Sequence, residues 1–327
     1  MTVAEVRERV RASGLLASGS RVVAMFSGGR DSVCLLDVAV ALCGAERVQA
    51  LHVNYGLRAE SDGEKRHCRE LCARLGVPIE VIDAPGGSAG GNLQAWAREL
   101  RYTAAKELAE RLEGRPPAGQ AGREPVVVAT GHTASDQVET ILYRLAASPG
   151  RRALLGMPAS EGRLVRPLLG LTRDATGDYC RERNLAWCDD SSNDSERYAR
   201  ARVRHGLLPA LDAIHPAAGA NVLRTAALLR EETELLDALV DAELAGGSSI
   251  AVERLRELPV ALRRLIVIRL AEQATGGFVA QAGERVEEIL ALGARGGRAE
   301  LHVGGLAGAV IERGELRMRR IEPREQR

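Results

Sequence analysis

The sequence has few aromatic residues, and its positive and negative charges almost cancel. Aromatics make up 3% of the 327 residues, so the core must be built largely from Ala, Leu and Val. Extended binding of nucleic acid by stacking bases on aromatic rings is therefore disfavoured. The formal net charge is +1, so a phosphate-rich partner must be bound by local arginine clusters rather than attracted by the whole molecule.

The sequence also lacks the cysteine spacing of zinc sites and the apolar run of an exported or membrane-anchored protein. Its six cysteines form no C-x-x-C pair, which favours reduced thiols in the cytoplasm. The first residues, MTVAEVRERVR, are polar and amphipathic, which is unlike a signal or an anchor. We therefore expect a cytoplasmic protein with no membrane partner.

Strand-like and helix-like segments alternate from the start of the chain to about residue 211. The predicted strands are short and continuously apolar, which is typical of a parallel sheet covered on both faces. In such sheets, ligands bind outside the carboxyl ends of the strands. We expect strands at residues 21–26, 48–54, 78–83 and 126–130, with helices at 32–43, 60–75, 92–113 and 134–147.

The last third of the sequence has a different pattern. Helical periodicity over residues 217–244, 257–274 and 282–292 is followed by short alternating segments at 299–303, 309–312 and 316–321, which predict helices and then β-hairpins. The length of the chain also favours two domains. We therefore predict an α/β domain at residues 1–214 and a smaller α+β domain at residues 215–327.

The segment SGGRDS lies between the first predicted strand and the first predicted helix after it. Two adjacent glycines let backbone N–H groups approach phosphate oxygens, and the helix adds its positive N-terminal end. A carboxylate at Asp31 fits such a loop if it holds a Mg²⁺ that bridges phosphates. The alternative is an ordinary Gly-Gly turn capped by Ser and Asp. The candidate nucleotide-binding residues are Ser27, Gly28, Gly29, Arg30, Asp31 and Ser32.

Polar residues also follow the second predicted strand, in the segment HVNYGLR at residues 52–58. Asn54 can pair with an adenine or ribose edge, and Arg58 can bind a phosphate through two hydrogen bonds. The alternative is an ordinary exit from a strand into a loop.

The segment GHTASDQVET, residues 131–140, follows the fourth predicted strand. On a helix, His132, Asp136 and Glu139 share one face because they lie at positions i, i+4 and i+7. Two carboxylates there form a natural seat for an ammonium group and could help to deprotonate an attacking amine. The alternative is that Thr133 and Asp136 form a helix cap while Glu139 is solvated.

Two groups of arginines could bind phosphates. Arg98 and Arg101 lie one helical turn apart, and either could neutralise charge on an α-phosphate; the alternative is a solvated basic face with Glu99 and Glu107 as partners. A second group could hold RNA phosphates, and its alternative is a solvated helix face. This second group consists of Arg197, Arg200, Arg202 and Arg204.

These segments, in this order, resemble the motifs of a known enzyme family. SGGRDS resembles the SGGxDS loop of the N-type ATP pyrophosphatases, which cleave ATP between the α and β phosphates. HVNYGLR and GHTASDQVET resemble the HVNHxLR and HHxxDQxET motifs of the tRNA(Ile)-lysidine synthetases, and the resemblance covers residues 21–211. The sequence departs from the family pattern at Tyr55, Gly131, Ala147 and Ala201.

The resemblance implies an adenine-nucleotide α-hydrolase-like α/β domain with a C-terminal tRNA-binding domain. It implies a carbon–nitrogen ligase that joins L-lysine to C2 of the wobble cytidine of CAU-anticodon tRNA(Ile). The reaction would use ATP with Mg²⁺ held by Asp31, pass through an adenylated tRNA, and release AMP and pyrophosphate. By resemblance the roles are catalysis for Asp31, Arg98, Arg101 and His132, lysine binding for Asp136 and Glu139, and ATP binding for His52, Asn54 and Arg58 together with residues 27–32.

Three alternatives stay open at this point. The first is another PP-loop enzyme, such as a tRNA thiolation enzyme or an amide-forming ligase. The second is an ATP-binding module without catalytic activity, and the third is a general RNA-binding protein, which the low charge and scarce aromatics disfavour. A homodimer is also left open.

Overall fold

The computed structural model describes residues 1–56, 61–84, 93–113, 125–147, 150–188, 199–294 and 296–322. The chain divides into two compact units, Met1–Ala227 and Leu228–Arg327. The boundary lies within one long helix, α10 (Ala218–Leu244). None of the helices in the described ranges is long and apolar enough to cross a membrane.

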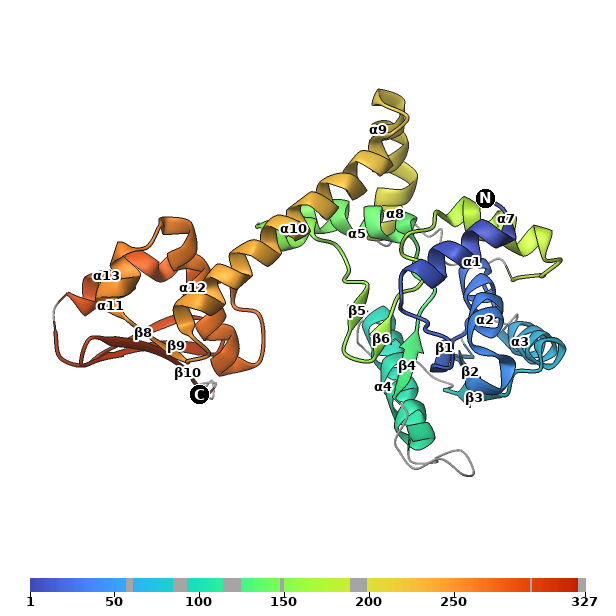
Figure 1. Cartoon of the computed structure of the whole chain (residues 1–327), viewed down its shortest axis with the longest axis horizontal. Helices are drawn as coiled ribbons and strands as arrows, with labels where there is room; N and C mark the ends of the chain where they lie inside the picture. Colours follow the sequence, from blue (N-terminus) through green and yellow to red (C-terminus); the bar gives the residue numbers. More distant parts are fainter. Residues whose placement is uncertain are drawn as a thin grey trace. The chain divides into compact units, whose positions relative to one another are not determined.

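The first unit is built on a six-stranded sheet in the order β3-β2-β1-β4-β6-β5 (Figure 1). Neighbouring strands are parallel except for the short edge pair β5 and β6. The prediction of a mainly parallel α/β sheet is therefore confirmed. The strands are β1 (Arg21–Met25), β2 (Val48–Asn54), β3 (Ile79–Asp83), β4 (Val126–Ala129), β5 (Ser160–Glu161) and β6 (Leu164–Val165).

Helices connect these strands and cover both faces of the sheet. The four predicted helices are present with bounds close to those expected from the sequence. The helical elements are α1 (Val3–Ala12), α2 (Arg30–Cys43), η1 (Ala45–Arg47), α3 (Ser61–Leu75), α4 (Leu93–Glu113), α5 (Ala134–Ala147), α6 (Arg151–Leu154), α7 (Arg173–Glu182), α8 (Ala199–Arg202), η3 (Val203–Leu207) and α9 (Leu208–Ile214).

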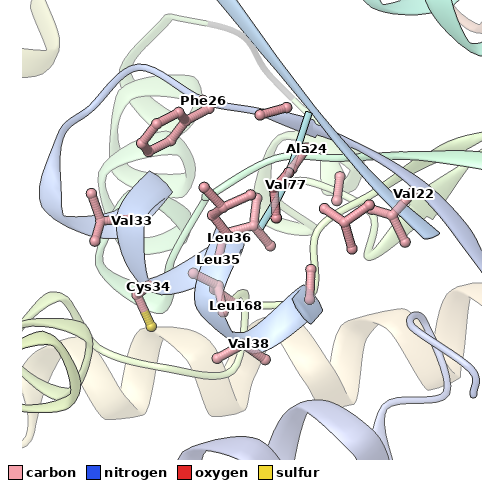
Figure 2. Close-up of a cluster of buried hydrophobic side chains, with 14 of the residues drawn as sticks. Val22, Ala24, Phe26, Val33, Cys34, Leu35, Leu36, Val38, Val77 and Leu168 are labelled. Carbon is pink, nitrogen blue, oxygen red and sulfur yellow. The ribbon is translucent and has the colours of Figure 1, made fainter. Parts of the chain in front are cut away.

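Alternate residues of β1 point into two separate cores. Val22 and Ala24 pack against side chains of α1, α2, α3 and α7, including the fully buried Leu35 and Leu36 (Figure 2). Val23 lies in the other core, with the side chains of α4. Burying a leucine contributes about 1.5–3 kcal/mol, so a strand that is buried on both faces must be apolar at every position.

The pairing of β1 with β4 brings the segments that follow these strands together. Ala24 lies opposite Ala129 in the parallel register, so the chain leaves both strands at the same edge. At Gly131 an added Cβ would lie 3.1 Å from the backbone carbon and oxygen of Asp31. The absence of a side chain at Gly131 therefore permits close contact between the start of α2 and the segment before α5.

The second unit consists of a four-stranded antiparallel sheet packed with helices. The strand order is β7-β10-β9-β8, and the core includes Ile266, Leu270 and Leu316. The predicted helices and hairpins are present, while β7 and α11 were not predicted. The elements after α10 are β7 (Ser249–Ala251), α11 (Val252–Glu257), α12 (Val260–Thr275), η4 (Ala280–Arg285), α13 (Val286–Gly293), β8 (Ala299–Gly304), β9 (Ala307–Glu312) and β10 (Glu315–Arg320).

A buried carboxylate joins three helices of the first unit. Asp37 of α2 is 2% exposed and accepts hydrogen bonds from Tyr179 of α7 (2.5 Å), Arg7 of α1 (3.2 Å) and Arg183 (3.1 Å from both Nε and Nη2). Burial raises the pKa of Asp37, but the hydrogen bonds from Arg183 and Tyr179 outweigh burial and hold the pKa below its usual value. The carboxylate therefore stabilises the packing of α1, α2 and α7 in its ionised form.

We expect Asp37→Asn to lower the free energy of unfolding by about 2 kcal/mol, because hydrogen bonds to a charged group are lost. The exposed Asp178, paired with Arg181, provides the control, and Asp178→Asn should change stability by less than about 0.5 kcal/mol. The stabilising effect is complete above the carboxyl pKa of the unfolded chain, about 3.9, and is lost as the pH falls through the lower folded value. Chemical denaturation at neutral and acidic pH measures this, and a difference between wild type and Asp37→Asn that grows on acidification would contradict it.

Candidate active site

The phosphate-loop segment forms a tight turn between β1 and α2. The hydroxyl of Ser32 donates to the Gly29 carbonyl oxygen (2.8 Å) and accepts from the Ser27 N–H (3.2 Å). Gly28 has a φ of +84°, where a Cβ would lie 2.9 Å from the Cys68 sulfur. Within the described residues no side chain caps the N-terminus of α2, so the first N–H groups of this helix are oriented for an anion.

Two other residues that were predicted to bind the nucleotide, His52 and Asn54, form hydrogen bonds within the protein. His52 is 4% exposed, and burial lowers its pKa; its Nδ1 lies 2.9 Å from the Phe26 carbonyl oxygen, which can only accept, so Nδ1 donates. Asn54 donates to Asp83 (3.0 Å) and accepts from the Gly56 N–H (3.1 Å). His52 thus holds the end of β1, and Asn54 holds the segment that follows β2. Arg58 lies outside the described residues.

Asp31 lies at the first turn of α2, where it meets residues from α7. Its carboxylate accepts a hydrogen bond from the Thr176 hydroxyl. The Nε of Arg173 lies 3.6 Å from Oδ2, and the Nε of Arg30 lies 3.4 Å from Oδ1. Within the described residues no three acidic, histidine or cysteine side chains form a metal site by themselves. A Mg²⁺ on Asp31 would therefore need phosphate and water ligands, which is how Mg²⁺ is usually bound beside nucleotides.

The two acids after β4 make different contacts. Oδ2 of Asp136 accepts from the N–H (2.8 Å) and hydroxyl (2.7 Å) of Thr133, so the helix cap considered as an alternative is present. Oδ1 of Asp136 remains for Arg173, which donates at 2.8 Å. Glu139 is not solvated: its side chain is 3% exposed and is bound by Arg204 through two hydrogen bonds of 2.7 and 3.0 Å.

Arg173 connects the phosphate loop with the acids of α5. Besides Asp31 and Asp136, its guanidinium contacts Glu139 at 3.4 Å. Arg173 was not among the residues predicted from the sequence, although the sequence offered a signal. Thr172 caps α7, so Arg173 is the first residue of that helix, and a cation is unfavourable at a helix N-terminus unless anions lie nearby.

His132 lies beside these acids in a strongly positive environment. Its Nδ1 is 2.8 Å from the Thr130 hydroxyl. Burial, together with the positive charges of Arg166, Arg98 and Arg200, lowers the pKa of His132 to about 4 despite the opposing effect of Asp136. The imidazole is therefore neutral at physiological pH.

The predicted arginine pair lies on α4, near aromatic side chains. The Arg98 guanidinium lies 4.7 Å from the centre of the Tyr102 ring, and Arg101 has a buried Nε without a hydrogen-bond partner among the described residues. Tyr55 packs edge-on against Trp96 at 5.8 Å. A shallow pocket of about 400 Å³ is lined by Ala95, Arg98, Glu99, Tyr102, Glu161, Leu164 and Arg166.

The candidate RNA-binding arginines are not equivalent. Arg200 and Arg202 are exposed on α8. Arg204 instead binds Glu139. It therefore belongs to the group formed by Asp31, Asp136, Glu139 and Arg173, which we call the acid cluster. Arg197 lies outside the described residues.

We expect Gly28→Ala to lower the free energy of unfolding by about 1 kcal/mol or more, because alanine is strained at positive φ and its methyl group would meet Cys68. Gly29→Ala is the matched control, since Gly29 has a φ of −76° and its nearest neighbour would be the Ser27 oxygen at 3.5 Å. Denaturant titrations measure both variants. Equal losses would show that Gly28 is not required by the turn.

Comparison with known proteins places this geometry in a family. A family model described as PP-loop domain matches residues 4–211. The tRNA(Ile)-lysidine synthase of Solibacter usitatus is 37% identical over 303 residues, covering 89% of this chain and 66% of that protein. That of Gloeobacter violaceus is 37% identical over 279 residues, covering 81% of each.

Other relatives are longer, and one solved structure shares the fold. The chain spans 49–56% of the length of the tRNA(Ile)-lysidine synthases of three Pseudomonas species, at 36% identity. A U34-tRNA thiolase from Methanococcus maripaludis superposes with a TM-score of 0.55 at 16% identity, covering 70% of this chain and 78% of that protein, which shows a common fold alone. From the extent of these matches, the chain belongs to the tRNA(Ile)-lysidine synthase family of PP-loop proteins.

Proposed function

We propose that this protein ligates L-lysine to C2 of the wobble cytidine of CAU-anticodon tRNA(Ile), using ATP. The observation that carries the proposal is the position of Arg173, whose guanidinium contacts Asp31 on one side and Asp136 and Glu139 on the other. A candidate nucleotide site and a candidate amine seat therefore lie within the reach of one side chain. An enzyme in which an amine attacks a base that has just been adenylated requires this proximity.

In the first step, ATP phosphates bind at the uncapped N-terminus of α2. The O2 of the cytidine attacks the α-phosphate, and pyrophosphate leaves. Mg²⁺ held by Asp31 would supply positive charge to the phosphate oxygens. Arg98 and Arg101 are our candidates for neutralising charge on the α-phosphate in the transition state.

In the second step, lysine attacks the activated base. Asp136 and Glu139 bind the lysine ammonium, and Asp136 takes the proton that must be lost before the nitrogen becomes a nucleophile. The amine then bonds to C2, and the C2–O bond breaks with loss of AMP. Adenylation makes this oxygen a good leaving group, which is the chemical reason for using ATP.

We assign His132 to positioning within the active site. With a pKa of about 4, its imidazole is a weak base at neutral pH, and general bases work best near the operating pH. A neutral ring that shares a hydrogen bond with Thr130 can still hold a substrate group in place. Bound phosphates would raise this pKa, because nearby anions favour the imidazolium.

The RNA partner requires surfaces beyond the reaction centre. We propose that Arg200 and Arg202, which are exposed on α8, bind tRNA phosphates, since such contacts position the RNA without reading its sequence. We assign a tRNA-binding role to the second unit and a cytoplasmic location to the protein. An unpaired base of an anticodon loop can be turned out of its stack to reach the site.

A thiolation reaction receives little support from the cysteines. A hydrogen bond with Cys180 and burial raise the pKa of Cys34, and burial raises the pKa of Cys68 and, to about 12, that of Cys72. Sulfur transfer uses the thiolate, so these side chains are protonated and unreactive. Cys188 is partly exposed but does not form a C-x-x-C pair.

Incubation of the purified protein with ATP, Mg²⁺, labelled lysine and CAU-anticodon tRNA(Ile) should label the tRNA. The same tRNA with uridine at the wobble position is the control and should stay unlabelled. In cytosine the C4 amino group donates electron density through N3 to O2, whereas uracil has a C4 carbonyl and a protonated N3, so its O2 is a poorer nucleophile toward the α-phosphate. Absence of label from both tRNAs with folded protein would refute the proposal.

We expect Asp136→Asn to reduce lysine transfer at least tenfold more than it reduces pyrophosphate release, because the amide neither attracts an ammonium nor accepts its proton. Parallel assays of labelled tRNA and of pyrophosphate separate the two steps. Asp174→Asn, at an exposed position in the first turn of α7, is the control. If both steps fell by the same factor, the assignment of Asp136 to the amine would be wrong.

A further inference from the structure

Arg173 contacts the carboxylates that two other cations would need, namely the Mg²⁺ bound with ATP and the ammonium group of lysine. Its guanidinium contacts Asp31 at 3.6 Å, Asp136 at 2.8 Å and Glu139 at 3.4 Å. Asp31 is the residue that we assign to Mg²⁺, and the other two acids are those that we assign to the lysine ammonium. The side chain of Arg173 therefore competes with both cations.

The location of Arg173 makes its attachment to the acids reversible. It is the first residue of α7, where the helix dipole disfavours a positive charge, so the contacts with the carboxylates hold it there. Its side chain is 25% exposed, whereas that of Glu139 is 3% exposed. The guanidinium can thus move toward a new anion without unpacking the core.

Glu139 does not depend on Arg173 alone. Arg204 binds both of its carboxylate oxygens, at 2.7 and 3.0 Å. A buried carboxylate left without a partner is costly, and Arg204 would continue to neutralise Glu139 if Arg173 moved away. The acid cluster therefore keeps its geometry while one of its cations is exchanged.

Electrostatics decide which cation is present. Two like charges in direct contact repel each other strongly near a protein surface. An ammonium group therefore binds Asp136 and Glu139 much more weakly while the guanidinium is also bound there. Triphosphate bound at the loop that contains Asp31 would provide Arg173 with a stronger anionic partner.

We propose that Arg173 couples nucleotide binding to lysine binding. The phosphates draw the guanidinium away from Asp136 and Glu139, and this movement opens the amine seat. Arg173 is a positioning residue in this scheme, which rests on the proposed function. Because coupling between two ligands is reciprocal, lysine must also strengthen nucleotide binding by the same factor.

The test measures the affinity of labelled lysine by equilibrium dialysis, with and without Mg²⁺ and an ATP analogue that has a methylene bridge between the α and β phosphorus atoms. In the wild type the analogue should tighten lysine binding about tenfold, within the range usual for such coupling. In Arg173→Met, which keeps side-chain length without charge, lysine should bind tightly without the analogue and the enhancement should disappear. Arg173→Lys should retain part of the coupling, because a single ammonium cannot contact three carboxylates at once.

Arg163→Met is the matched control, since Arg163 also binds a carboxylate, that of Glu113 at 3.0 Å, outside the acid cluster. It should leave the enhancement unchanged. The coupling would be overturned if wild-type protein bound lysine equally well with and without the analogue. It would also be overturned if the Arg173→Met variant bound lysine more weakly than the wild type in both conditions. Wild-type protein that binds no lysine in any condition and labels no tRNA would overturn the proposed function itself.

Discussion

The pairing of β1 with β4 is the constraint on which the candidate active site depends. These strands are distant in sequence, yet their parallel register places Ala24 beside Ala129. The loop that follows one strand and the helix that follows the other must therefore begin at the same edge of the sheet. Gly131 lets the two segments come so close that a Cβ there would be 3.1 Å from the backbone of Asp31. A site for a nucleotide and a site for an amine can then share one arginine.

The charges in this region also explain how an almost neutral protein can handle highly charged substrates. Asp31, Asp136 and Glu139 are each paired with arginines, so the acids are stable before any substrate cation reaches them. Burial, together with nearby arginines, lowers the pKa of His132 and keeps its imidazole neutral. Local pairs of opposite charge replace the long-range field that a net charge of +1 cannot provide.

Local patterns in the sequence predicted most of the fold, because apolar strands and periodic helices follow from residue order alone. The strand at Val48–Asn54 and the helix at Ala134–Ala147 have the bounds expected. The phosphate loop and the acids could be recognised because their spacing is local. The partners of the acids could not, since Arg173 and Arg204 lie 34 and 65 residues from Glu139 and only folding brings them together. Asp136 forms the helix cap with one carboxylate oxygen and contacts Arg173 with the other, so the presence of the cap does not by itself exclude a second role for this side chain.

The distribution of aromatic rings determines what can be seen of this protein in solution. Both tryptophans and all five tyrosines precede residue 228, and the second unit contains one aromatic residue, Phe278. Trp96 packs against Tyr55 at the start of α4, and Trp187 precedes Cys188, whose N–H donates to the Gly28 carbonyl oxygen at 2.9 Å. Intrinsic fluorescence is therefore a reporter of the first unit, with one emitter near the phosphate loop. Unfolding of the second unit would not change tryptophan or tyrosine fluorescence directly and would have to be followed by circular dichroism or calorimetry.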